Sequence, residues 1–277
     1  MAENVAVYRA QGESFSFLGS LRRLARHREI LLTFAVRDLK IRYKQTLLGV
    51  LWAVIPPFML MVVFSIIFSR FARMPSEGLP YPVFVYSALL PWTFFSSSVV
   101  AAANSLTSNF GIISKVYFPR EILPWAAIAA TGADFLVSFA IFGGIIAFYR
   151  TPVTPYAFLV LPLLAIQIVF AAGIGLLAAA LNVTYRDVRY ALPLMLQLWM
   201  YATPIVYPAS VVPARADVFY YLVNPMAGLV DGYRRVLARG LPLDPVLTLL
   251  SAASAFLVFF LCYRIFKHME RELVDAM

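Results

Sequence analysis

The sequence predicts an all-α polytopic membrane protein with six transmembrane helices, an N-terminal amphipathic interface helix and two short re-entrant helices before the last span. Of the 277 residues, 62% are hydrophobic and only 13% are charged, and long uncharged runs separate the charges. Soluble domains contain roughly 45–50% apolar and about 25% charged residues. A chain this apolar cannot bury its side chains in one water-exposed globule, which excludes an ordinary soluble enzyme, a disordered chain and a disulfide scaffold.

Six stretches with at most one charge are long enough to cross a membrane. A helix needs roughly 20 apolar residues to span the hydrocarbon core, and it satisfies its own backbone hydrogen bonds without water. The uncharged runs are 45–69, 78–114, 151–185, 190–214 and 245–263, and Asp134 alone interrupts 122–149. We therefore expect one transmembrane domain over 47–264, with spans at about 47–69, 84–106, 123–148, 157–181, 190–206 and 245–264. Pro56 and Pro57 should kink the first span, and Pro193 and Pro204 should break the regularity of the fifth.

The distribution of Lys and Arg predicts the orientation. With the N-terminus inside, 16 of the 23 basic residues lie on the cytoplasmic side and 7 lie outside, as the positive-inside rule requires. Both termini are therefore expected in the cytoplasm, as polar tails over 1–30 and 265–277. The outer cluster of Arg234, Arg235 and Arg239 is the exception. The net charge of +9 comes from clusters between apolar runs, which favours anionic lipid headgroups over nucleic acid as the partner.

Residues 31–46 are expected to form an amphipathic helix that lies in the membrane interface. One helical face carries Leu32, Val36, Leu39 and Tyr43, and an adjoining face carries Arg37, Lys40 and Lys44. Apolar residues with this spacing enter the acyl region, while the basic residues reach lipid phosphates. The alternative is a plain basic flank that fixes the orientation of the first span.

The stretch 207–244 is too polar for a span and too patterned for a loose loop. Asn224 followed by Pro225 is typical of a helix start, and Gly240 is typical of a helix end. A shorter apolar piece, 218–223, precedes this helix. We expect two short helices that dip back into the outer leaflet, and the alternative is a surface helix that caps the bundle.

Two features of the spans concern helix packing. Asp134 is the only acidic residue inside an expected span, about 18 Å deep at the rise of an α-helix, where a charge is costly. It is expected either to be a proton-transport site or to have a structural role, in which it is protonated or paired and holds the third span against a neighbour. Small residues four positions apart favour close helix packing, and they are Ala140 and Gly144 in the third span and Ala171, Gly175 and Ala179 in the fourth.

Aromatic residues gather at the end of the fifth span and just beyond it: Trp199, Tyr201, Tyr207, Tyr220 and Tyr221. Aromatic faces stack on sugar rings, and the tyrosine hydroxyl group adds a hydrogen-bond partner. The alternative is an aromatic belt at the outer membrane surface. The sequence leaves both interpretations open.

Motifs for catalysis are missing from the sequence. It contains no G-x-x-x-x-G-K-[ST], so no P-loop nucleotide site is expected. His27 and His268 lie at opposite ends of the chain without metal-ligand spacing, and Cys262 is the single cysteine. The sequence therefore predicts no catalytic residue, no metal site and no cofactor in this chain.

Five segments occur in an order that is similar to a known family. They are RDLKIRYKQTLLG (37–49) running into Trp52, KVYFPREILP (115–124), NVTYRDV (182–188), TPIVYP (203–208) and NPM (224–226). Together they resemble the type-2 ABC-transporter permeases that export polysaccharides, most of all O-antigen, and similar permeases export teichoic acid or capsule. The resemblance covers about residues 35–240 and leaves the first 30 residues without a family signal.

The resemblance implies a homodimer of six-span subunits bound to two copies of a separate cytoplasmic ATPase, which would hold the ATP and Mg²⁺. The coupling helix would be region 111–121, with Ser114, Lys115, Val116, Tyr117, Phe118, Pro119, Arg120 and Glu121. The interface helix would lie where a lipid-linked substrate enters, with Arg37, Lys40, Arg42, Tyr43 and Lys44. The channel and the outer gate segment, 207–244, would use Trp199, Tyr201, Tyr207, Tyr220, Tyr221, Arg234 and Arg235, and the two arginines would face a pyrophosphate or an acidic sugar.

We therefore expect the channel-forming membrane subunit of an ATP-driven exporter that moves a lipid-linked polysaccharide of O-antigen type out of the cytoplasm. It would lie in the bacterial inner membrane among membrane lipids, and it would be no enzyme because the ATPase is another chain. Within the family, the alternative is a teichoic acid or capsular polysaccharide exporter. From another class, the alternative is a proton-coupled transporter that uses Asp134, and it predicts transport without ATP.

Overall fold

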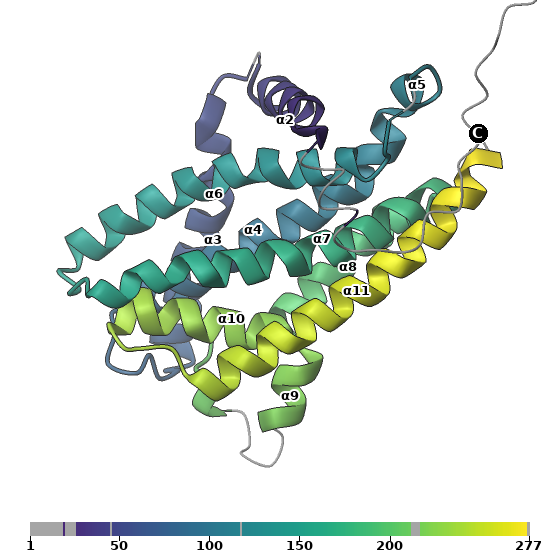
Figure 1. The fold of residues 1–277 in the computed structure, drawn as a ribbon. Coiled ribbons are helices and arrows are strands. Elements are labelled where there is room, and N and C mark those ends of the chain that lie inside the picture. The colour runs from purple at the N-terminus through teal and green to yellow at the C-terminus, as the bar shows by residue number, and fades with distance from the viewer. Residues whose placement is uncertain (1–18, 20–25, 45, 117, 212–216, 276–277) are drawn as a thin grey trace, which may run out of the picture.

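A computed structural model describes residues 19, 26–44, 46–116, 118–211 and 217–275, apart from the side chains of 217 and 271–275. Within these residues the chain is all-helical, without strands (Figure 1). The α-helices are α2 (Arg28–Tyr43), α3 (Ile55–Phe64), α4 (Tyr81–Ser108), α5 (Phe110–Ile113), α6 (Ile122–Phe148), α7 (Val160–Thr184), α8 (Val188–Ala202), α9 (Asp217–Val223), α10 (Pro225–Arg234) and α11 (Pro245–Asp275). Shorter 3₁₀ or π segments are η1 (Gly49–Ala53), η2 (Ser65–Phe71), η3 (Pro155–Leu159), η4 (Ala209–Val211) and η5 (Arg235–Arg239). Most of the expected N-terminal tail lies outside the described residues.

Four helices are long and apolar enough to cross a membrane: Tyr81–Ser108, Ile122–Phe148, Pro155–Thr184 and Pro245–Glu270. They coincide within a few residues with the expected second, third, fourth and sixth spans. Helix α11 continues past the expected end of the last span as far as Asp275. Much of the expected C-terminal tail is therefore helical.

The expected first and fifth spans are shorter and less regular than predicted. Residues 47–69 are divided among η1, α3 and η2, and the longest apolar helix there, Ile55–Phe71, has 17 residues. Pro56 and Pro57 do not kink a span but occupy the first turn of α3, where a missing N–H costs no hydrogen bond. Helix α8 has 15 residues and contains Pro193. The described residues thus hold four candidate spans, and a total of six stays a prediction.

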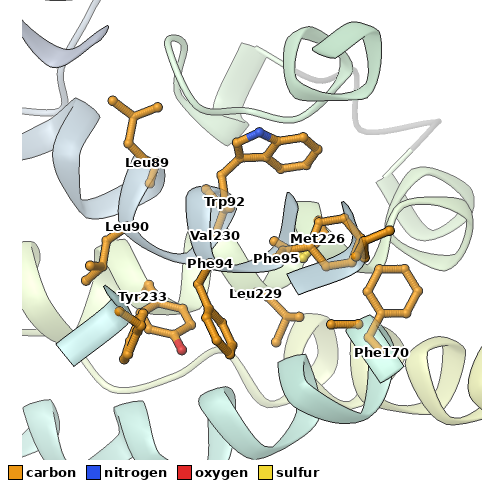
Figure 2. Close-up of a cluster of buried hydrophobic side chains, with 14 of the residues drawn as sticks. Leu89, Leu90, Trp92, Phe94, Phe95, Phe170, Met226, Leu229, Val230 and Tyr233 are labelled. Carbon is orange, nitrogen blue, oxygen red and sulfur yellow. The ribbon is translucent and has the colours of Figure 1, made fainter. Parts of the chain in front are cut away.

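Helix α4 lies at the centre of the bundle and packs against α3, α6, α7, α8 and α10. Figure 2 shows part of the core that its side chains form with those of α7 and α10. Its polar side chains find partners inside the bundle. The hydroxyl oxygen of Ser98 lies 2.7 Å from that of Thr131 in α6, and Asn182 of α7 donates to the Ala103 carbonyl at 2.9 Å. These contacts fix α6 and α7 against α4, and α4 and α6 form two walls of the candidate site described below.

Glycines bring α7 into close contact with two neighbours. A Cβ added to Gly175 would lie 2.7 Å from the Cβ of Ala102 in α4, and one added to Gly173 would lie 2.6 Å from the Cα of Phe259 in α11. The close packing expected at Gly175 is confirmed. Around Gly144 of α6, no atom of another described element lies within 4 Å of an added Cβ, so Gly144 makes no comparable contact with a neighbouring helix.

The outer gate segment contains two short helices, α9 and α10, as the sequence predicts. Helix α10 begins at Pro225 behind Asn224. The following segment, η5, ends at Gly240, whose φ of 63° is the left-handed conformation that glycine adopts easily. Every residue of α10 is buried, so this helix is part of the bundle and not a cap on its surface. Its depth in a membrane stays a prediction.

Candidate functional site

A cavity of about 530 Å³ lies between the end of α2, η1, α3, α4 and α6. Its wall combines a charged pair, several hydroxyl groups and aromatic rings. The charged and phenolic members are Arg42, Asp134 and Tyr43, the hydroxyl groups come from Thr46, Thr93, Ser96, Ser97, Thr131 and Ser138, and the rings include Trp52, Phe94 and Phe135. Such a wall offers donors, acceptors and apolar faces, which together bind organic ligands with polar groups.

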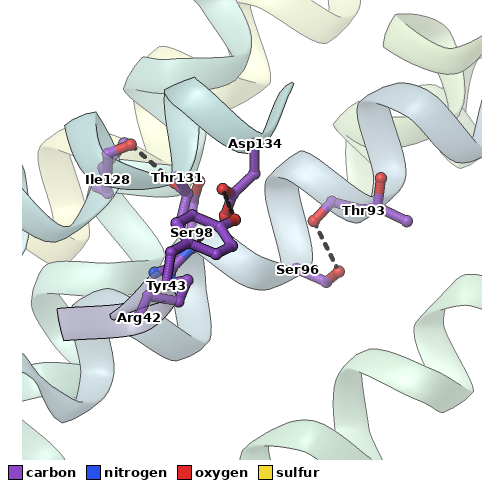
Figure 3. A network of polar contacts seen from close by, with 8 residues as sticks. All are labelled: Arg42, Tyr43, Thr93, Ser96, Ser98, Ile128, Thr131 and Asp134. Atoms are coloured by element: carbon purple, nitrogen blue, oxygen red, sulfur yellow. Dashed lines mark hydrogen bonds and ion pairs between the residues drawn. The ribbon is translucent and has the colours of Figure 1, made fainter. Parts of the chain in front are cut away.

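Asp134 is not an isolated intramembrane acid. Arg42 and Tyr43, both at the C-terminal end of α2, donate to its two carboxylate oxygens (Figure 3). Burial, together with the neighbouring carboxylate, raises the pKa of Tyr43 to about 12, so the phenol stays neutral and remains a donor at neutral pH. The geometry supports the paired interpretation of Asp134, and the neighbour that it holds against α6 is α2.

A second set of contacts joins α2 to the end of α4 and to the coupling segment, 111–121. The guanidinium group of Arg37 donates to Asn109 Oδ1 at 2.6 Å. The ring centroids of Phe34 and Phe118 lie 5.7 Å apart. Five residues of α2 and its end are expected at the membrane interface. Three of them, Arg37, Arg42 and Tyr43, form hydrogen bonds inside the subunit. The other two, Lys40 and Lys44, are exposed.

Two apolar side chains on one side of α2 are exposed. Leu32 and Val36, one turn apart, are 57% and 49% exposed, next to the exposed Lys40. An exposed apolar face on a helix that also carries basic residues is typical of a membrane interface. The position of α2 at the membrane surface stays a prediction.

The coupling segment has an exposed tip. Helix α5 projects from the end of α4 (Figure 1), and residues 114–116, which comprise Ser114, Lys115 and Val116, are exposed. Tyr117 lies outside the described residues. The tip is therefore accessible to a second protein.

The base of the coupling segment is buried against α11. Phe118 and Glu121 are buried, and Pro119 and Arg120 are half-buried. Glu121 accepts a hydrogen bond from Tyr263 at 2.9 Å and forms an ion pair with Lys267 at 2.9 Å. Because its carboxylate is held inside the subunit, Glu121 fixes the segment on α11 and is not exposed to a docking partner.

Arg234 lies inside the subunit. Its Nη2 donates to the carbonyls of Pro204 and Ile205 at 2.9 and 3.0 Å, and its guanidinium carbon lies 3.7 Å from the ring centroid of Phe84. The side chain is fully buried. Arg234 therefore does not face an open surface of the subunit, in contrast to the role that the resemblance implies for it.

The chain that leaves α8 is buried without being helical, so its backbone needs other partners. Arg234 supplies two of them, and Tyr81 donates to the next carbonyl, that of Val206, at 2.6 Å. The neighbouring Arg235 is half-buried and donates to the Pro242 carbonyl at 3.0 Å. Of the two arginines, only Arg235 is partly exposed, and its role toward an anionic substrate stays a prediction.

Trp199 is part of the core. Its ring packs against the rings of Trp92, Phe95 and Phe170, and its indole nitrogen donates to Asn224 Oδ1 at 3.0 Å. This hydrogen bond joins α8 to the start of α10. The position indicates a packing role within the subunit for Trp199.

The four tyrosines that are expected to line the channel have different surroundings. Tyr221 is buried, and Tyr220 donates to the Ala202 carbonyl at 2.7 Å. Tyr207 donates to the Tyr201 carbonyl at 3.3 Å. The side chain of Tyr201 is 50% exposed. Tyr201 therefore has the most exposed side chain of the set, and its contact with a substrate stays a prediction.

Sequence reasoning did not identify the partners that hold these segments. Asn109 and Asn224 lie in or beside apolar stretches, and Lys267 follows the last one. A polar group beside so much apolar surface needs a hydrogen-bond partner, and this signal marks all three residues. It does not say which distant residue is the partner, because that depends on how the helices pack.

These features define a helical, multi-span membrane protein with a polar cavity among its helices. Residues 30–238 match the family described as ABC-2 type transporter. The match covers most of the chain. The protein therefore belongs to the ABC-2 transporter family, and the matched residues form the family's membrane domain.

Three relatives illustrate the similarity. The chain is 30% identical over 242 residues to the O-antigen export system permease protein RfbA of Myxococcus xanthus, a match that covers 86% of this chain and 92% of the relative. It is 30% identical over 216 residues to a protein of the same name from Klebsiella pneumoniae, covering 76% and 81%. It is 24% identical over 211 residues to the polysialic acid transport protein KpsM of Escherichia coli, covering 74% and 80%.

Proposed function

We propose that this chain is the permease subunit of an ABC exporter that moves a lipid-linked polysaccharide of O-antigen type across the bacterial inner membrane. The observation that carries the proposal is the similarity to an O-antigen export permease along 92% of that protein's length. The chain has no P-loop motif, so the ATP and Mg²⁺ would be bound by a partner ATPase. The functional unit would be a homodimer with two ATPase subunits and with both termini in the cytoplasm.

The exposed tip of the coupling segment supports the docking of the ATPase there. Lys115 and Val116 lie at the tip, and Glu121 and Phe118 fix its base to the rest of the subunit. A segment that is exposed at one end and held at the other moves the helices to which it is attached. In this proposal, ATP binding by the partner displaces the segment and opens the channel.

The polar cavity supports a role where the substrate enters. It lies beside the C-terminal end of α2, between the first apolar helix and α6. Arg42 offers charged donors for a phosphate group, and the hydroxyl groups and rings of the wall suit sugar hydroxyls and sugar faces. The linkage between lipid and glycan contains both kinds of group.

A capsular polysaccharide exporter is the second candidate, because the chain is also similar to a polysialic acid transport protein. A teichoic acid exporter is a further alternative within the family. A proton-coupled transporter that uses Asp134 is less well supported, because Arg42 and Tyr43 already hold that carboxylate. It predicts transport without ATP that Asp134→Asn abolishes.

Co-expression with the ATPase encoded beside this chain tests the proposal. We expect a complex with two copies of each chain that hydrolyses ATP in lipid. We also expect the pair to restore surface polysaccharide in cells that lack an O-antigen exporter and make the matching glycan. A chain that binds no ATPase, or that transports in the absence of ATP, would contradict the proposal.

A further inference from the structure

Four side chains join the base of the coupling segment to α11. We call them the Glu121 cluster: Glu121, Tyr263, Lys267 and Glu270. Glu121 is fully buried. Its Oε2 accepts a hydrogen bond from the Tyr263 hydroxyl group at 2.9 Å and forms an ion pair with Lys267 Nζ, also at 2.9 Å. Lys267 also pairs with Glu270 at 2.7 Å. One ammonium group therefore bridges a carboxylate of the coupling segment and a carboxylate of α11.

Stability alone does not account for this cluster. Burying a carboxylate costs free energy, and replacing a buried ion pair by well-packed apolar residues is often neutral or stabilising. Charge-assisted hydrogen bonds add geometric specificity, because they are short and directional. The cluster thus holds Glu121 at one position relative to α11.

The other end of α11 contacts the outer gate segment. Helix α11 packs against α9 and α10, and Ser254 donates to the Leu222 carbonyl of α9 at 2.5 Å. A Cβ added to Gly228 of α10 would lie 2.0 Å from Ser251 Oγ. Figure 1 shows α11 as one continuous helix from α9 and α10 to the end of the molecule from which α5 projects.

We propose that α11 mechanically links the coupling segment to α9 and α10, and that Glu121, Tyr263 and Lys267 are the residues that position it. This inference rests on the proposed function, from which it takes the coupling and gate roles. A displacement of the coupling segment moves the end of α11 through Glu121. Because α11 is continuous and in close contact with α7 at Gly173 and with α10 at Gly228, the displacement reaches the outer gate segment. Packed rigid elements of this kind carry coupling between distant sites.

Three variants and a control test the cluster. Lys267→Met removes the ammonium group, and Lys267→Arg keeps its charge and its donors. The double variant Glu121→Gln with Lys267→Met leaves neither partner as an unpaired buried charge, so it remains informative if the single variant fails to fold. Arg264→Met removes a charge from an exposed position on the same helix and is the matched control. Each variant is expressed with the ATPase, and assembly and ATP hydrolysis are measured in lipid nanodiscs.

A cysteine on α9 reports movement of the outer gate segment. Phe219 is 73% exposed, and Phe219→Cys in a Cys262→Ala background gives one accessible thiol for a water-soluble maleimide. In the protein with an unchanged Glu121 cluster, we expect ATP with vanadate to alter the rate at which the thiol at position 219 is labelled. Lys267→Arg and Arg264→Met should retain this response. Lys267→Met and the double variant should reduce the response, and export relative to ATP hydrolysis, by about fivefold or more, at the lower end of typical coupling.

Assembly and ATP hydrolysis should persist in the double variant, which separates a loss of transmission from a loss of folding. A double variant that assembles and keeps the full labelling response and full export would overturn the proposal. An equal loss in Arg264→Met would overturn it as well, because that effect would not depend on the cluster. If the unsubstituted chain binds no ATPase, the proposed function itself fails and the inference fails with it.

Discussion

Asp134 depends on two donors that come from another helix, Arg42 and Tyr43. Arg42→Ala leaves a largely buried carboxylate with one donor fewer, and we expect it to lower the free energy of unfolding by on the order of 1–3 kcal/mol. Asp134→Asn keeps an acceptor for Tyr43 and should cost less. Thermal unfolding in detergent measures both effects. Lys40→Ala, at an exposed position of α2, is the control, and equal losses in Arg42→Ala and Lys40→Ala would disprove the role of the pair.

Arg234 fills a buried position where shape matters as much as charge. Its planar guanidinium group covers the ring of Phe84 and reaches two carbonyls at once, and a lysine side chain cannot do both. We expect Arg234→Lys to lower the free energy of unfolding by about 2 kcal/mol. Arg235→Lys, at a half-buried position, should change it by less than half as much. Similar unfolding temperatures for the two variants would argue against this account of the segment after α8.

Close contacts between helices depend on glycines at positions where there is no space for a larger side chain. At Gly173 of α7, an added Cβ would lie 2.6 Å from the Cα of Phe259, whereas at Gly144 of α6 it would meet no atom of another described element within 4 Å. Gly173→Ala should therefore destabilise the bundle by about 1–3 kcal/mol through overpacking. Gly144→Ala should be neutral or stabilise by up to about 1 kcal/mol, because alanine favours a helix. Unfolding in detergent checks the sign of both changes.

The elements that sequence analysis predicts best are those that hydrophobicity alone determines. The second, third, fourth and sixth spans are long uncharged runs, and the helices at Ile122–Phe148 and Pro245–Glu270 follow them closely. The first and fifth spans were harder to predict because uncharged residues do not ensure a continuous helix. Pro56 and Pro57 begin a helix instead of bending one, and the chain after Ala202 is held by side chains of other elements.

Side-chain partners across the whole molecule could not be predicted, for a related reason. The sequence shows that Asp134 needs a partner, but the pairing with Arg42 depends on how α2 lies against α6. Similarly, the charge of Glu121 predicts an exposed loop residue. In the structure Glu121 is fully buried and forms an ion pair with Lys267. Polar residues in an apolar chain therefore mark where tertiary contacts form, while helix packing decides which residues meet.

The exposed side of α8 indicates where the molecule requires another surface. Leu194, Met195 and Leu198 are 59%, 64% and 62% exposed, and α8, at 15 residues, is shorter than the roughly 20 needed to cross the membrane unaided. We expect this side to meet the second copy of the chain in a homodimer. Exposed apolar patches often mark protein–protein contacts, and most homo-oligomers are two-fold dimers.

Cysteine cross-linking measures this contact directly. In a Cys262→Ala background, Met195→Cys should give a covalent dimer with a short bifunctional maleimide in membranes, since a two-fold axis brings the same residue of both copies close together. Leu257→Cys, 56% exposed on α11, serves as the control and should remain monomeric. Cross-linking at position 257 but not at 195 would move the dimer contact to α11. It would also remove α8 from the wall of the proposed channel, so that Tyr201 would no longer be expected to contact the polysaccharide.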